Sequence, residues 1–214
     1  GDVVVDPPDG RLPALTENAE ARLNSPEAGR IADMRGGRLP VETYEQLDLG
    51  DRCLWYRGIP SFPTGYNNNY HIVQAPGVVA ILQEHIHDVR FIPIDGRPHL
   101  PESIRQYAGD SRGHWDGDTL VVETRNFTDK TSSFSPSVTM AAGDGSTLHL
   151  TERFSRIAED TLLYEFTVDD LTTFTKPFSA SIPMKRGEAL FEYACHEGNY
   201  GLLNILAGAR QEER

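Results

Sequence analysis

The sequence predicts a mainly β protein, in which an antiparallel up-and-down meander closes into a barrel between an N-terminal arm and a C-terminal helix. Three observations support this prediction. Short segments after residue 51 alternate apolar with polar residues, brief turns rich in Gly, Pro, Asn and Asp separate them, and residues 199–213 show helical spacing instead. Closing a meander into a barrel removes exposed strand edges and encloses a small cavity. A two-sheet sandwich is the alternative architecture.

The N-terminal part of the chain is expected to pack on the barrel as an arm, because it contains few β-branched residues beyond a short extended piece at its start. Thr16 is a candidate N-cap for a helix that runs to about Asn24. A second short helix can begin at Pro26, since proline suits the first helical position. The chain therefore divides into an arm over residues 1–50 and a barrel domain with a C-terminal helix over residues 51–214.

The barrel domain contains a series of predicted strands. They cover residues 70–74, 78–94 (as one long strand or two with a bulge), 119–124, 148–157, 161–168, 174–184 and 190–195. A turn at residues 158–160 joins two of them as a hairpin. In the strand after this turn, Leu162, Tyr164, Phe166 and Val168 share one face, which we expect to point into the barrel.

Composition and charge exclude several classes of function. The chain has 214 residues, which suits one domain with extensions. It carries 20 basic against 32 acidic residues, and the resulting formal charge of −12 repels the phosphate backbone of nucleic acids. No apolar run approaches the roughly 18 to 20 residues that a membrane-spanning helix needs. We therefore expect a small-molecule ligand or substrate as partner, with no nucleic acid and no membrane span.

The two cysteines, Cys53 and Cys195, lie at opposite ends of the predicted barrel domain. A disulfide between them would join the first part of the domain to its last strand and close a long loop, which strongly constrains the unfolded chain. Two buried free thiols are the alternative. We predict the bridge, and with it an oxidising compartment, so that the protein would be secreted or periplasmic.

The densest group of ionisable side chains lies in one predicted strand. Its members are Glu84, His85, His87, Asp88 and Arg90. On a strand, His85 and His87 share one face, and the two carboxylates share the other with Arg90. A strand that buries one face rarely tolerates such a density of charge without a purpose. We therefore predict that all five are catalytic, with His87 as the acid or base.

Two alternatives stay open for this group. Histidines two residues apart can hold one metal ion when a third ligand arrives from elsewhere, but on an exposed strand they are usually only solvated. The Glu84, Asp88 and Arg90 side chains can form a structural ion network, since lone buried charges are costly. We expect no metal and no cofactor, because the sequence contains neither a calcium-loop spacing nor a Gly-rich phosphate loop.

Residues that could bind a substrate occur in several segments. We predict this role for Asn67, Asn69, Tyr70, His71, Trp115 and His196. Around Asn67 and Asn69, consecutive amides lie between two aromatic rings, which suits the mouth of a pocket. The same composition equally suits an Asn-stabilised turn that leads into a strand. His196 stands beside a glutamate where its predicted strand ends, so the two could act as a base and its orienting partner.

The run Gly113–Leu120, with the order Gly-His-Trp, resembles the G-x-W pattern of lipocalin-like (calycin) β-barrels. This resemblance implies a tryptophan that plugs one end of a barrel, so Trp115 is either a core plug or a substrate contact. The runs at residues 6–11, 66–70 and 195–200 resemble those of uncharacterised secreted bacterial proteins, which supply no activity to transfer.

A barrel interior with histidine, carboxylates and arginine can transfer protons without a cofactor. The histidine moves the proton near neutral pH, and the arginine steadies developing negative charge. We therefore expect a cofactor-independent acid–base enzyme, a lyase, isomerase, cyclase or hydrolase, acting on a small organic molecule inside the barrel. The alternative is a non-catalytic secreted binding protein for a small apolar ligand.

Overall fold

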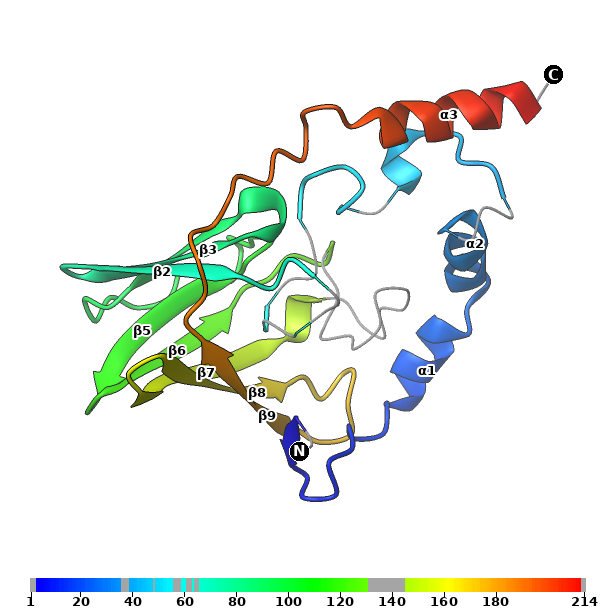
Figure 1. Ribbon diagram of the computed structural model, residues 1–214. Coiled ribbons are helices and arrows are strands. Elements are labelled where there is room, and N and C mark those ends of the chain that lie inside the picture. Colours follow the sequence, from blue (N-terminus) through cyan, green and yellow to red (C-terminus); the bar gives the residue numbers. More distant parts are fainter. Residues whose placement is uncertain are drawn as a thin grey trace.

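The computed structural model of the 214-residue chain describes residues 3–35, 39–47, 49–55, 59–60, 63, 66–130 and 145–212 (Figure 1). The strands are β1 (Val4–Asp6), β2 (Tyr70–Ala75), β3 (Val78–Gln83), β4 (Val89–Pro93), β5 (Asp110–Asp116), β6 (Thr119–Arg125), β7 (His149–Ala158), β8 (Thr161–Asp169) and β9 (Phe178–Lys185). The helices are α1 (Glu17–Leu23), α2 (Pro26–Arg35) and α3 (Tyr200–Glu212), with short 3-10 helices η1 (Tyr44–Gln46), η2 (His85–His87) and η3 (Gly145–Thr147).

The described strands form two antiparallel sheets. One has six strands in the order β1-β9-β8-β7-β6-β5, and the other has three in the order β2-β3-β4. Consecutive strands from β5 to β9 are neighbours, so the predicted antiparallel meander is confirmed. The hairpin predicted at residues 158–160 is also present, with Ala158 opposite Thr161.

No hydrogen-bonded pairing joins the two sheets within the described part of the chain, so these strands do not close into the predicted barrel. The close approach of β4 to β5 supplies the physical reason. A Cβ added at Gly113 in β5 would lie 2.9 Å from methyl carbons of both Ile92 and Ile94, so the side chains of this segment pack onto the face of β5. When a strand packs its side chains against the face of another strand, it does not lie beside that strand's edge. It therefore cannot form backbone hydrogen bonds with it.

The hydrophobic core lies on the inward face of the six-stranded sheet. Of the four residues predicted to share the inward face of β8, Tyr164, Phe166 and Val168 are at most 1% exposed and Leu162 is half-buried, so this face is confirmed along most of its length. One part of this face packs against Trp55 and other residues from outside the sheets, and another part packs against β3 and β4. The inward face is therefore covered by two different parts of the chain.

Three predicted elements differ from the structure. The long strand predicted at 78–94 is broken by η2, where Ile86 has a φ of 61° and the chain turns. Strand β5 was not predicted, because it contains no β-branched residue. The strand predicted at 190–195 is absent, and residues 186–199 lie outside regular secondary structure. The free edge of β9 is already occupied by β1, so this last segment has no ladder to extend there.

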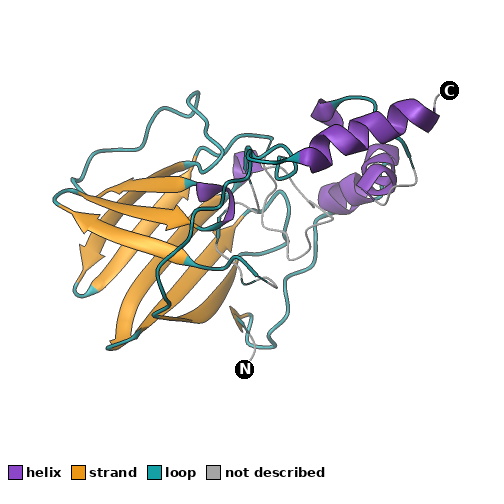
Figure 2. Ribbon diagram, turned by 45° about the horizontal axis from the view of Figure 1, so that its top comes forward, coloured by secondary structure: helices purple, strands orange, loops and turns teal. Residues whose placement is uncertain are grey.

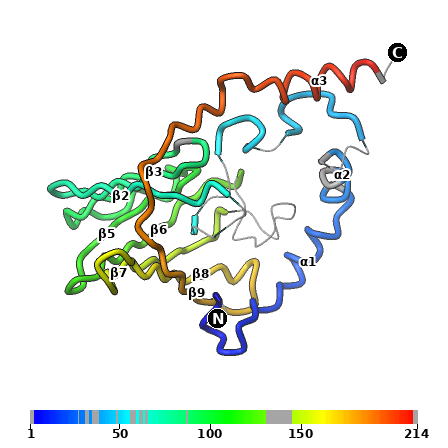
Figure 3. The backbone as a smooth tube through the Cα atoms, viewed as in Figure 1, coloured from blue at the N-terminus to red at the C-terminus, as the bar shows by residue number. Residues whose placement is uncertain are grey.

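Helices α1, α2 and α3 lie together on one side of the molecule, away from the two sheets (Figures 1 and 2). Thr16 caps α1 as predicted, since its hydroxyl accepts a hydrogen bond from the Ala19 amide. The arm begins as β1 beside β9, where the tube in Figure 3 also places the N-terminus.

The predicted disulfide between Cys53 and Cys195 and the predicted C-terminal helix are both present. None of the described helices has the length and apolar character needed to cross a membrane.

Candidate functional site

The ionisable group predicted on one strand instead spans a turn between two strands. Gln83 ends β3, η2 follows, and β4 begins at Val89. Because Ile86 adopts a left-handed backbone and is only 2% exposed, side chains on either side of it do not alternate as they would on a strand. The expectation that His85 and His87 share a strand face is therefore wrong. The side chain of His87 lies outside the described residues.

Glu84 and Asn69 form one contact between the two predicted segments. Both the backbone amide and the side-chain amide of Asn69 donate hydrogen bonds to Oε2 of Glu84, over 3.2 and 2.8 Å. The ring of His85 lies 4.8 Å from the ring of Tyr193. The segment that carries Asn69, the segment that carries Glu84 and His85, and the chain after β9 thus meet at η2. The catalytic and binding roles given to these residues stay predictions.

Arg90 takes part in an ion pair, but with a partner from β7. Its guanidinium donates from Nη1 and Nη2 to Oε2 and Oε1 of Glu152, over 2.5 and 3.2 Å, and the hydroxyl of Tyr164 donates to Oε1 over 2.8 Å. Burial alone lowers the pKa of Arg90, but the charge and hydrogen bonds of Glu152 outweigh it, so the pKa is raised. Within the described residues, the guanidinium of Arg90 bonds to Glu152 and the carboxylate of Glu84 bonds to Asn69. These contacts do not support the alternative ion network between Arg90 and Glu84.

The other predicted binding residues lie apart from one another. His71 is exposed on β2, opposite Leu82 of β3. Trp115 is 46% exposed at the end of β5, so it does not plug the core. His196 is exposed, one residue after the disulfide. Of the predicted site residues, Tyr70 and Arg90 line one cavity together.

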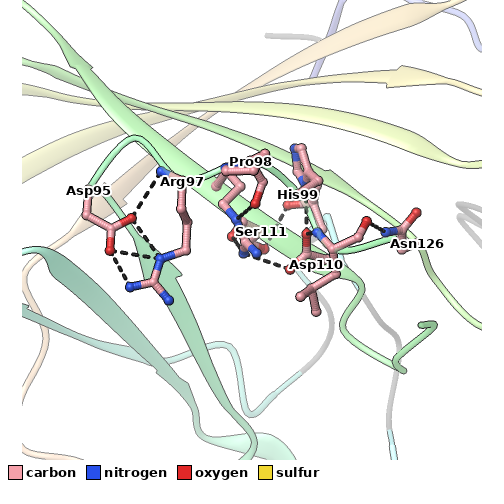
Figure 4. Close-up of polar contacts among 10 residues, drawn as sticks. Asp95, Arg97, Pro98, His99, Asp110, Ser111 and Asn126 are labelled. Carbon is pink, nitrogen blue, oxygen red and sulfur yellow. Dashed lines mark hydrogen bonds and ion pairs between the residues drawn. The ribbon is translucent and has the colours of Figure 1, made fainter. Parts of the chain in front are cut away.

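A histidine–aspartate pair that the sequence did not single out lies between the β4–β5 connection and the start of β5. Nδ1 of His99 is 2.8 Å from Oδ2 of Asp110, and the Leu100 amide donates to the same oxygen over 2.9 Å (Figure 4). The His99 side chain is 10% exposed and that of Asp110 only 4%. The carboxylate is therefore shielded, while the imidazole reaches the edge of the shielded region.

Arg112 fixes the other side of the carboxylate. It lies on the same face of β5 as Asp110, two residues on, and its Nη1 is 2.7 Å from Oδ1. Its Nε donates to the carbonyl oxygen of Pro98 over 2.9 Å, directly before His99. Both carboxylate oxygens thus have donors, and the segment that carries His99 is attached to β5 at two points.

Two unusual backbone positions hold this arrangement. Asn126 has a φ of 61°, and its side-chain amide donates to the carbonyl oxygen of Leu100 over 2.9 Å. Gly109 has a φ of 66°, and a Cβ there would lie 2.8 Å from the Arg125 carbonyl oxygen. Only glycine fits such a position. These two positions hold the backbone next to Asp110 and Leu100.

The arrangement orients His99 for proton transfer. A donor at Nδ1 held by a carboxylate leaves Nε2 as the nitrogen that can accept or release a proton. Nε2 has no hydrogen-bond partner within the described residues, and it is not among the buried atoms left unpaired there. Ser111 is not a nucleophile for this histidine, because its hydroxyl lies 2.9 Å from that of Thr124 on the opposite face of β5.

The only local pattern near His99 was the turn that precedes it, and this turn does not point to Asp110. Residues 95–98 are typical of a turn, and Figure 4 shows Asp95 bonded to Arg97 there, apart from His99. The contact of His99 with Asp110 crosses an irregular connection, so spacing along the chain does not reveal it.

In the described residues, no three His, Cys, Asp or Glu side chains are grouped to hold a metal ion. No known protein family, curated protein or solved structure matches the chain.

Proposed function

We propose that this protein is a cofactor-independent acid–base enzyme, a lyase, isomerase, cyclase or hydrolase, acting on a small organic molecule, and that His99 is its acid or base. The contact between Nδ1 of His99 and the shielded Asp110 carboxylate carries the proposal. A positioned histidine of this kind contributes about 10²- to 10⁴-fold to a rate.

Each neighbour of His99 has a part in the proposed mechanism. Asp110 holds the tautomer with its proton on Nδ1, so that Nε2 carries the reactive lone pair. When Nε2 takes a proton from the substrate, the adjacent carboxylate stabilises the imidazolium that forms. Arg112 bonds the second carboxylate oxygen and keeps the plane of the carboxylate fixed. Asn126 holds the segment after His99 through the Leu100 carbonyl.

The compartment is part of the same proposal. The Cys53–Cys195 disulfide supports a secreted or periplasmic protein, because such bonds persist in oxidising surroundings. The meander supports the likeness to lipocalin-like barrels in its strand order from β5 to β9. The roles predicted for His87, Asp88 and His196 belong to the same reaction only if their side chains approach the substrate of His99.

The tautomer of His99 tests the proposal without a substrate. Long-range ¹H–¹⁵N spectra should show the neutral ring protonated at Nδ1, with Asp110→Asn shifting the tautomer balance. His149→Gln is a matched control, since His149 is an exposed histidine at the start of β7. A neutral ring protonated at Nε2 would remove the lone pair that the mechanism needs.

Turnover gives the second test. The protein is assayed against esters, lactones and enolisable ketones, with hydrolysis followed by absorbance and proton exchange followed by NMR in D₂O. Where the wild type turns over, His99→Gln should lower kcat by about 100-fold or more, while His149→Gln retains it. Full activity in His99→Gln would place the acid or base elsewhere.

A further inference from the structure

A cavity lies between the two sheets, on the opposite side of β5 from the face that carries Asp110. Its lining residues are Tyr70, Ile72, Ile81, Arg90, Phe154, Tyr164 and Met184. These come from β2, β3 and β4 on one side and from β7, β8 and β9 on the other. The cavity thus lies where β2 and the six-stranded sheet face each other without pairing.

The polar end of the cavity offers hydrogen-bond donors and no net charge. Glu152 is fully buried, and its two oxygens accept from Arg90 and Tyr164. A guanidinium has five N–H groups, of which two point to this carboxylate. The guanidinium of Arg90 makes no other hydrogen bond to a described residue, although the side chain is 10% exposed. The spare N–H groups therefore face the space that Arg90 lines.

The remaining walls are apolar or aromatic, which sets the chemistry of a fitting molecule. A hydrocarbon would leave the Arg90 donors unpaired, and unpaired buried donors cost binding energy. A carboxylate would place a second anion beside Glu152 with one cation between them, which is unfavourable at low dielectric. A neutral molecule with an acceptor oxygen satisfies both conditions.

We propose that this cavity binds a small neutral carbonyl compound, a ketone, aldehyde or ester, with its oxygen on Arg90 and its apolar part against Ile72, Phe154 and Met184. The proposal is independent of acid–base chemistry at His99, so either can fail without the other.

Met184 is the side chain that admits such a molecule. The cavity has room for about one water molecule, so a ligand must displace part of the wall. Methionine is unbranched and adapts to new contacts, and Met184 is partly exposed near the end of β9. The chain after β9 runs past β2 toward α3 in the views of Figures 1 and 3, and Cys195 attaches it to Cys53. A ligand therefore enters between β2 and β9, beside this attached segment.

Three probes of similar shape test the proposed ligand class by titration in ¹H–¹⁵N NMR. Acetophenone has the carbonyl oxygen, ethylbenzene lacks it, and benzoate is charged. We expect acetophenone to bind about tenfold more tightly than ethylbenzene, because one hydrogen bond to a charged donor is gained, and more tightly than benzoate. Equal binding of ethylbenzene overturns the role of Arg90, and preferred binding of benzoate overturns the neutral class.

Variants at the entrance locate the binding. Arg90→Met leaves a buried charge and can unfold the protein, so the variant used is Met184→Trp, which fills the entrance. Ile157→Trp is the control, since Ile157 is 57% exposed near the C-terminal end of β7, two strands away from Met184. Met184→Trp should abolish saturable binding of acetophenone, and Ile157→Trp should retain it. Unchanged binding in Met184→Trp, or no saturation in wild type below about 10 mM, overturns the proposal.

Discussion

Replacement of Arg90 by methionine tests the central polar cluster of the fold. The substitution removes both donors of the ion pair and leaves Glu152, which is fully buried, with the Tyr164 hydroxyl as its remaining donor in the cluster. Removing one partner of a buried pair costs about 3–5 kcal/mol. A domain is stable by only about 5–15 kcal/mol, so the loss is a large fraction of the total.

Equilibrium unfolding in urea measures this loss as a shift of the midpoint at constant slope. Arg153→Met is the matched control, because Arg153 is the next residue to Glu152 but points outward. Its ion pair with Asp116 spans 3.0 Å between side chains that are 43% and 63% exposed, and such pairs contribute about 0–1 kcal/mol. We therefore expect a large shift for Arg90→Met and almost none for Arg153→Met.

The triple variant Arg90→Met, Glu152→Leu, Tyr164→Phe separates an unpaired charge from lost packing. With no polar group left, it should recover most of the stability that Arg90→Met loses, since apolar replacements of buried pairs are often neutral. A loss below about 1 kcal/mol in Arg90→Met, or a triple variant that is less stable still, would refute this reasoning.

Three further measurements test other parts of the structure. Gly109→Ala should destabilise by more than about 1 kcal/mol, because its φ is 66° and the added Cβ meets a carbonyl oxygen; urea unfolding measures this. The hydrogen bonds from Arg97 hold the pKa of Asp95 below its ordinary value. Their stabilisation is present above the ordinary pKa and is lost as the pH falls through the lowered one, so Arg97→Met should raise the midpoint of Asp95 in a ¹³C NMR titration. Reduction of the disulfide, whose cysteines are 142 residues apart, should lower stability by up to about 5 kcal/mol, and the denatured, unreduced protein should show no free thiol.

The sequence predicted those parts of the fold in which a local pattern and a tertiary partner agree. The alternation at Tyr164, Phe166 and Val168 predicted an inward face, and all three side chains are buried there. It could not predict β5, because residues such as Asp110, Arg112 and the glycine after it have low strand propensity. This strand forms because β6, which is rich in valine, pairs with it along its whole length. Pairing with a strong strand overrides local propensity.

The candidate site was predicted less well, for a related reason. Treating residues 83–90 as one strand placed their side chains by alternation, and a single left-handed residue, Ile86, removed that basis. Asn69 and Glu84 were both predicted as site residues and do form a hydrogen bond, but they are 15 residues apart and no local pattern pairs them. Arg90 was predicted to be catalytic, with an ion network as the alternative, and its actual partner Glu152 lies 62 residues further along the chain, where no local pattern links the two.

The positions of the two proposed sites follow from the alternation of β5 and β7. On β5, Asp110 and Arg112 share the outward face, where the connection from β4 crosses and brings His99 to them, while Ser111 points inward. On β7, Glu152 points inward among apolar residues, so it needs a cation from the facing sheet, and Arg90 of β4 supplies it. The six-stranded sheet thus holds a shielded carboxylate on each face. Asp110 orients His99 and Glu152 orients Arg90, and each of these side chains keeps N–H groups or a ring nitrogen that can bind another molecule. The two pairs lie on different strands with different partners, so a substitution in one is expected to leave the other intact.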